Sequence, residues 1–188
     1  MDTPAPRYTL VPPGAGEAHW QPEPANGWIE VFCSPGMPGA PQGCSAGLQT
    51  LPPLGKIREH AHPAQTELFW FVEGEALARL DGVVRRVRKG SFLAAPPHIR
   101  HGFINDGAYP MTFMWVLVPA GLEDFFRAMG KPLVSVGEDP TPYPRPATAG
   151  AIEMATVFEE LDPPATAPWD PTPITDPCVL DKLRQEAI

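Results

Sequence analysis

Short apolar runs separated by turn-forming residues fill the middle of the chain, from residue 51 to residue 120. The runs are rich in aromatic and β-branched residues, and Gly, Pro, Asn or Asp interrupts them about every ten residues. An earlier run over residues 45–55 predicts one more strand, which ends at the double proline Pro52-Pro53. Repeated short strands of this kind are typical of a β-sandwich or β-barrel. We therefore predict an all-β core over residues 45–120.

A hairpin and two helices can be placed in this pattern. Asp81-Gly82 lies between two such runs and can supply the two positive φ angles of a type I′ hairpin turn. Helical periodicity appears over residues 121–131, where four apolar side chains share one face and Gly130 would end the helix. Residues 149–162 predict a second helix, which the prolines that follow would end. The C-terminal region thus adds one or two helices to the β core.

The distribution of prolines divides the chain into an ordered middle and two Pro-rich arms. Of 27 prolines, seven fall within residues 51–120, nine precede this segment and eleven follow it. We therefore predict an N-terminal arm with an edge strand (1–44), the β core, and a C-terminal region with helices and an acidic, Pro-rich tail (121–188). Residues 131–145 and 162–177 hold too many prolines for regular elements. They could lie extended over a surface, close a pocket or reach a neighbouring subunit.

The charge balance argues against nucleic-acid or membrane binding. Lys and Arg number 14 and Asp and Glu 22, so the net charge is −8, and neither nucleic acid nor an anionic membrane attracts such a chain. Small-molecule partners are expected instead. One local basic cluster, formed by Arg85, Arg86, Arg88 and Lys89, is expected to be a solvated face of one strand.

Cysteine usage and the first residues of the chain favour a cytoplasmic protein. The three cysteines are an odd number without Cys-x-x-Cys spacing, so neither a disulfide framework nor a zinc ribbon is indicated. The opening residues, MDTPAPRYTL, show no basic segment followed by an apolar one. The longest apolar run, residues 113–118, is far too short to cross a bilayer. We expect a soluble protein that is not exported.

Three histidines and one glutamate lie at the ends of the predicted strands. His60 and His62 are two residues apart, so a strand would present both imidazoles on one face. Glu67 has the wrong parity to share that face in one continuous strand, so residues 63–65 must form a turn or bulge that resets the register. His101 begins another predicted strand. If that strand lies beside the first, all four side chains meet inside the barrel.

Three imidazoles and a carboxylate form a donor set for a divalent transition metal. Fe, Mn, Ni, Co, Cu and Zn accept such ligands, whereas calcium and magnesium would require more oxygen atoms. Burying these groups without a metal would leave several polar atoms unpaired, at a cost of about 1 to 3 kcal/mol each. We therefore predict one divalent metal, with no preference among the six, bound by His60, His62, Glu67 and His101.

The same residues resemble the two sequence motifs of the cupin superfamily. The first motif runs Gly, His-x-His, Glu, Gly, and the second runs Gly, Pro-x-Gly, His, Asn. The matching positions are Gly55, His60, His62, Glu67 and Gly74, then Gly90, Pro96, His101 and Asn105. The spacer after Gly55 is one residue shorter than the motif is often written, and His98 replaces the glycine of the second motif. Either that turn needs no positive φ, or His98 adopts one.

The resemblance implies a double-stranded β-helix, the jelly-roll barrel of cupins, and metal binding by the four residues. It does not select a reaction, because cupins include dioxygenases, decarboxylases, isomerases, epimerases, lyases and binding modules. The chain is also loosely similar to single-cupin bacterial quercetinases in its length, its ligand set and a Phe-Phe helix after the barrel. Cupin barrels commonly pair, so a homodimer is expected.

The predicted pocket favours a dioxygenase acting on an aromatic or enolic small molecule. Phe69, Phe71 and Phe103 share parity with the ligands and would line an apolar cavity around the metal. The resemblance to quercetinases implies that Glu67 serves as both ligand and base. His98, three residues before a ligand, could act as an acid or base. The alternatives are a non-redox lyase or isomerase, in which Glu67 or His98 moves a proton, and a ligand-binding cupin without catalysis.

Overall fold

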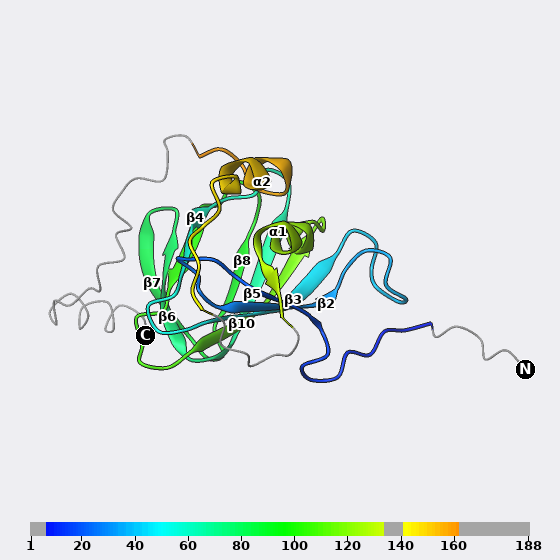
Figure 1. The fold of residues 1–188 in the computed structure, drawn as a ribbon. Coiled ribbons are helices and arrows are strands. Elements are labelled where there is room, and N and C mark those ends of the chain that lie inside the picture. The colour runs from blue at the N-terminus through cyan, green and yellow to red at the C-terminus, as the bar shows by residue number, and fades with distance from the viewer. Residues whose placement is uncertain (1–6, 134–140, 162–188) are drawn as a thin grey trace, which may run out of the picture.

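Two β-sheets face each other to form a barrel, and two short helices lie beside it (Figure 1). The structure is a computed structural model that describes residues 7–133 and 141–161. Its elements are β1 Glu17–Trp20, β2 Trp28–Cys33, β3 Ser45–Leu51, β4 Lys56–His60, β5 Thr66–Glu73, β6 Glu75–Leu80, β7 Val83–Arg88, β8 Phe92–Ala95, β9 His101–Ile104, β10 Met111–Val118, α1 Leu122–Met129, β11 Lys131–Pro132 and α2 Ala149–Ala155. The larger sheet has the order β11-β1-β2-β3-β10-β5-β8, and the smaller one β4-β9-β6-β7.

The strands of the barrel form one long hairpin that is wound into a double helix. β6 pairs with β7, β5 with β8, β4 with β9 and β3 with β10, so each strand of the first limb meets its counterpart in the second. Successive strands from β3 to β6 alternate between the two sheets, as do those from β7 to β10. This winding is the double-stranded β-helix that the sequence predicted. It brings His60 directly opposite His101.

The tip of the long hairpin has the predicted turn. Asp81 and Gly82 have φ angles of 45° and 80°, and a type I′ turn requires positive φ at both positions. β6 ends directly before this pair and β7 begins directly after it. The carboxylate of Asp81 also accepts a hydrogen bond from the backbone N–H of Arg100 (2.9 Å), which ties the tip to the turn before β9.

Aromatic rings fill the barrel interior. β10 alternates between buried and more exposed residues along its length, as a strand with one face in the core does. Its Phe113 joins three other phenylalanines, none more than 2% exposed, in a cluster with ring centroids 5.0–5.6 Å apart. Edge-to-face and tilted packing at this spacing is favourable for aromatic pairs. The other three members are Phe69, Phe71 and Phe103.

α1 forms where it was predicted, whereas α2 is shorter than predicted. α1 buries its apolar face, packs Phe126 against Trp115 (centroids 5.3 Å apart) and ends at Gly130. α2 ends at Ala155, and not at the later prolines, and the hydroxyl of the next residue, Thr156, donates to the carbonyl groups of Ile152 and Glu153. The chain then turns back toward the barrel. In the described part of the chain, no helix is long and apolar enough to cross a membrane.

The two arms extend the larger sheet. The first arm supplies both β1 and β2 where one edge strand was predicted, and β11 pairs with β1 at the outer edge. Part of the Pro-rich segment 131–145 lies against this arm, since the hydroxyl of Tyr143 donates to the carbonyl of Trp20 (2.8 Å). Residues 134–140 and the predicted Pro-rich tail, 162–177, lie outside the described residues.

The basic cluster on β7 is solvated in part. Arg85, Arg88 and Lys89 are exposed, as predicted. The prediction is wrong for Arg86, whose side chain is 6% exposed and donates two hydrogen bonds to the carboxylate of Asp106 (2.7 and 2.8 Å). The two hydrogen bonds come from Nη1 and Nη2, and a bidentate, charge-assisted pair of this kind is among the strong hydrogen-bonding arrangements. Alternation along β7 predicted a solvated face but not this buried carboxylate.

Candidate metal centre

The four predicted ligands converge inside the barrel. His60 ends β4, His62 follows two residues later, Glu67 is the second residue of β5, and His101 begins β9. The potential ligand atoms all lie within 4.8 Å of one another. Oε2 of Glu67 lies 2.9 Å from Nε2 of His62, 3.0 Å from Nε2 of His101 and 4.0 Å from Nε2 of His60. Because bonds from such ligands to a metal are about 2 Å long, these atoms can share one ion after small movements.

Each imidazole is oriented by a hydrogen bond from its outer nitrogen to a backbone carbonyl. The Nδ1–H of His60 donates to the carbonyl of Arg58 (2.9 Å), and that of His62 donates to the carbonyl of Val157 (2.7 Å). The Nδ1–H of His101 donates to the carbonyl of Ile99 (2.8 Å). A carbonyl can only accept, so Nδ1 carries the proton and the neutral ring keeps a lone pair on Nε2. Metal-binding histidines are generally held in this way. The residues present therefore fit a metal ion.

The electrostatics of the cluster provide an ionised carboxylate. Burial raises the pKa of Glu67, but hydrogen bonds with His101 and His62 outweigh burial and lower the pKa to about 2. Burial lowers the pKa of His62, but the hydrogen bond with Glu67, the negative charge of Glu67 and the hydrogen bond with Val157 together raise it above the usual value. Burial, and then the neighbouring His101 and His62, lower the pKa of His60 well below its usual value. A proton and a metal ion thus compete for the same atoms.

The turn over residues 63–65 does more than reset the register. Parity predicted a break between His62 and Glu67, and β4 does end before β5 begins. The break also carries the chain from the smaller sheet to the larger one. His60 and His101 therefore approach from one sheet, in which they face each other, and Glu67 approaches from the opposite sheet. A centre that lies between two sheets requires this crossing.

A segment after α2 covers the centre, and sequence analysis missed it. We call residues Val157, Phe158 and Glu159 the closing segment. Its first residue accepts the hydrogen bond from His62, and the ring of Phe158 lies against the imidazoles of His60 and His62, with centroids 5.0 and 5.2 Å apart. Val157 and Phe158 are buried. The periodicity of residues 149–162 pointed to a continuous helix, and a carbonyl acceptor has no side-chain signature.

His98 contacts the closing segment and does not line the pocket. Its φ is 68°, so it adopts the positive φ of the glycine that it replaces in the motif. Its side chain is 68% exposed, and its Nδ1 lies 2.7 Å from Oε2 of Glu159. The backbone N–H of Glu159 also donates to the carbonyl of Ala61 (3.1 Å). His98 therefore holds the closing segment against the motif turn.

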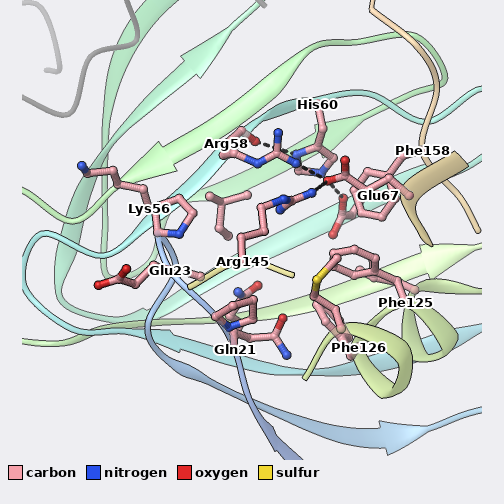
Figure 2. Close-up of a pocket in the computed structure, with 18 of the residues that line it drawn as sticks. Gln21, Glu23, Lys56, Arg58, His60, Glu67, Phe125, Phe126, Arg145 and Phe158 are labelled. Carbon is pink, nitrogen blue, oxygen red and sulfur yellow. Dashed lines mark hydrogen bonds and ion pairs between the residues drawn. The ribbon is translucent and has the colours of Figure 1, made fainter. Parts of the chain in front are cut away.

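A pocket of about 650 Å³, counted to its open mouth, leads to the centre (Figure 2). His60 and Glu67 line it, whereas His62 and His101 are buried at 2% and 1% exposure. Of the three phenylalanines predicted to line the pocket, Phe69 does so, but Phe71 and Phe103 lie deeper, in the aromatic core. The remaining apolar wall comes mainly from α1 and the closing segment: Leu122, Phe125, Phe126, Met129 and Phe158.

The pocket also carries more charge than the sequence predicted. Arg58 of β4 and Arg145, which precedes α2, both form ion pairs with Glu153 of α2 (Figure 2). Lys56 and Glu23 also line the pocket. The wall is therefore apolar on the side of α1 and charged on the side of β4.

Comparison with known proteins places these features in one family. A family model described as "Cupin domain" matches residues 47–117, which include the four potential ligands. Quercetin 2,3-dioxygenase of Bacillus subtilis is 35% identical over 77 residues, which make up 41% of this chain and 23% of that protein. The match thus spans less than a quarter of that relative's length.

Two Streptomyces proteins match over a larger share of their own length. Polyketide synthase CurC of Streptomyces cyaneus is 28% identical over 118 residues, which are 63% of this chain and 76% of that protein. Protein SchB of Streptomyces halstedii is 30% identical over 93 residues, which are 50% of this chain and 67% of that protein. With the two motifs, the wound hairpin and the family match, these similarities show that the chain belongs to the cupin superfamily.

Proposed function

We propose that this cupin is a metal-dependent dioxygenase that acts on an aromatic or enolic small molecule. The observation that carries the proposal is a three-histidine, one-carboxylate cluster at a pocket with a wall of aromatic and aliphatic side chains. Such a wall suits a flat, largely apolar substrate and keeps bulk water from the reacting atoms. When bound, the metal would acidify a substrate hydroxyl and supply the one-electron chemistry that O₂ requires.

The protein's own groups have distinct tasks in this proposal. The backbone carbonyls hold the three imidazoles with Nε2 turned inward, and Phe158 covers two of the rings. Glu67 accepts a proton from the substrate hydroxyl at Oε1, since Oε2 is the atom that approaches the three imidazoles. His98 takes no part in this scheme, since it lies outside the pocket lining.

The names of two relatives support this substrate class. One relative is a dioxygenase of quercetin, which is a polyphenol with an enolic hydroxyl, and the other is named a polyketide synthase. Polyketide chains carry carbonyl groups that enolise readily. Both kinds of molecule offer an acidic oxygen next to unsaturated carbon, which is what the proposed reaction needs.

A non-redox lyase or isomerase is the second candidate, because Glu67 faces the pocket and could move a proton without O₂. Turnover measured in an anaerobic chamber separates the two. A dioxygenase should stop without O₂ and consume one O₂ per substrate, whereas an unchanged anaerobic rate would contradict our proposal. A third candidate, a ligand-binding cupin without catalysis, would release a bound phenol or enol chemically unchanged.

Metal analysis of the purified protein tests the centre itself. His60→Ala and His101→Ala should each lose most of the bound metal, because each removes one ligand from opposite limbs of the hairpin. His19→Ala is the matched control, since His19 is buried elsewhere and pairs with Glu17. Full metal retention in both ligand variants would refute the site. An oxygen-electrode screen of phenols and enols with the metal-loaded protein then tests the reaction.

A further inference from the structure

Two arginines share one carboxylate in the wall of the pocket. Nη2 of Arg58 and Nη2 of Arg145 both pair with the same atom, Oε1 of Glu153. The side chains of Arg145 and Glu153 are 26% and 18% exposed and so are partly withdrawn from water, whereas that of Arg58 is 47% exposed and also reaches solvent. A guanidinium group has five N–H donors, and one shared oxygen cannot satisfy two such groups. We call these three residues the arginine patch.

The arginine patch carries an excess positive charge. Its two guanidinium groups and one carboxylate sum to 2 − 1 = +1. The other charged residues that line the pocket, apart from Glu67 of the metal centre, are Lys56 and Glu23, whose charges cancel. Burial, and the nearby charge of Arg58, lower the pKa of Arg145 although Glu153 opposes the shift. Outside the metal centre, the pocket lining therefore carries one positive charge that no carboxylate balances.

The arginine patch lies next to the metal centre. Arg58 is two residues before His60 in β4, and its carbonyl accepts the Nδ1–H of that ligand. Figure 2 shows the guanidinium groups of Arg58 and Arg145 on the same side of the pocket as His60, with Phe125 and Phe126 on the other side. Because residues two apart on a strand lie about 7 Å apart on the same face, one small molecule can contact both the patch and the centre.

We propose that Arg58 and Arg145 bind a carboxylate group of the substrate, which makes the substrate class small aromatic or enolic acids. A carboxylate would supply the missing negative charge and accept paired hydrogen bonds from the guanidinium groups. Glu153 is then an internal competitor that holds the arginines in place when the pocket is empty. The inference that the substrate is aromatic or enolic depends on the function proposed above. The inference that it carries a carboxylate depends on the arginine patch alone.

Binding of two matched probes tests the proposal without any turnover. The probes are 3-hydroxybenzoate and its neutral amide, 3-hydroxybenzamide, titrated into the metal-loaded protein by calorimetry. The acid should bind about tenfold or more tightly than the amide. Arg145→Gln should remove this preference by weakening the acid alone, and Glu153→Gln should strengthen the acid by removing the competitor. Arg85→Gln is the control, because Arg85 is an exposed arginine on β7 that does not line the pocket.

Three results would overturn the proposal: no measurable binding of the acid, equal affinity for acid and amide, or equal weakening of both probes by Arg145→Gln. The last result would mean that the arginine patch only fastens α2 to the barrel. Arg58→Gln gives an independent test if Arg145→Gln does not fold. These outcomes are separate from the test of the reaction, because a protein that consumes no O₂ can still prefer the acid.

Discussion

Glu67 supplies the single negative charge of the metal centre. The other three potential ligands are neutral when they bind a metal, and the backbone carbonyls that hold them carry no formal charge. The two histidines that approach Glu67 most closely keep its pKa at about 2, so the carboxylate is ionised at any pH at which the protein would be used. The affinity for a dication should therefore depend strongly on this one residue.

Glu67→Gln keeps the size of the side chain and removes its charge. We expect the dissociation constant for the bound metal to rise by at least about tenfold, since even groups behind the ligands change it about 10- to 100-fold. Competition with a coloured chelator measures the constant. Glu73→Gln, an exposed change in the same strand, should leave it unaltered. Equal constants for Glu67→Gln and wild type would show that the carboxylate is not a ligand.

The sequence predicted the cluster of potential ligands but not the atoms that orient them. Alternation and the motif spacing identified His60, His62 and His101, because both depend on side-chain type and position. The acceptors for Nδ1 are backbone carbonyls, which every residue has, so no residue type marks them. Alternation along the strand correctly placed Phe71 on the inner face of the sheet. Alternation shows which face a side chain is on, but not how far it lies from the pocket, and Phe71 lies in the core below the pocket.

The contact of His98 with the closing segment connects two elements that are far apart in the chain. Periodicity alone predicted one helix over residues 149–162, and it could not show that the chain leaves the helix to reach the barrel. The positive φ of His98 directs its side chain toward Glu159. The same segment supplies the acceptor for His62. Loosening this contact should therefore affect the metal centre indirectly.

Glu159→Gln and His98→Gly should each release metal to a chelator several times faster than wild type. Glycine tolerates the positive φ at position 98, so that variant removes the contact without straining the turn. Stopped-flow mixing with a chromogenic chelator measures the rate. Glu160→Gln, an exposed change of the neighbouring residue, is the matched control. Wild-type rates in both variants would show that the closing segment does not depend on this contact.

A second pair of elements, β1 and α1, is joined by Glu17 and Arg127. The hydrogen bond from Arg127 lowers the pKa of Glu17 from 4.5 to about 2. Because the folded-state pKa is below the unfolded value, the pair stabilises the protein fully above about pH 4.5 and loses this effect as the pH falls toward 2. The side chains are 43% and 39% exposed, so the contribution is below about 1 kcal/mol.

Glu17→Gln tests this pair through thermal unfolding at several pH values. The variant should unfold at a lower temperature than wild type near neutral pH, and the difference should shrink as the pH drops below about 4.5. A difference that grows on acidification would contradict the assigned direction of the pKa shift.

At the scale of the whole molecule, the metal would join the two limbs of the wound hairpin. Three potential ligands come from the first limb and His101 from the second. A ligand at 100 times its dissociation constant stabilises the fold by about 2.7 kcal/mol. For a chain of this size, that corresponds to a rise in Tm of about 5–10 °C.

Calorimetric scans of the metal-loaded and chelator-treated protein measure this shift. His101→Ala should show almost no difference between the two preparations, because the second limb then has no ligand. A large metal-dependent shift in that variant would mean that the ion binds elsewhere.

The outer face of the larger sheet carries an exposed apolar stripe that bears on the predicted homodimer. Trp70 lies opposite Phe92 on one side and Met114 on the other, and the three are 57%, 65% and 36% exposed. We expect a second copy of the chain to cover this stripe, since exposed apolar patches commonly mark interfaces. Phe92→Lys should give a monomer by light scattering, whereas Tyr109→Lys, at an exposed aromatic residue outside the stripe, should not. A monomeric wild-type protein would end this expectation.

The closing segment also imposes an order on events during synthesis. A ribosome makes His62 long before Val157, the residue whose carbonyl orients it, since 95 positions separate the two. The barrel strands and all four potential ligands leave the ribosome before the closing segment does. Until residues 157–159 are made, His62 lacks the carbonyl that orients its ring. Residues 157–159 are therefore the last part of the centre to be made.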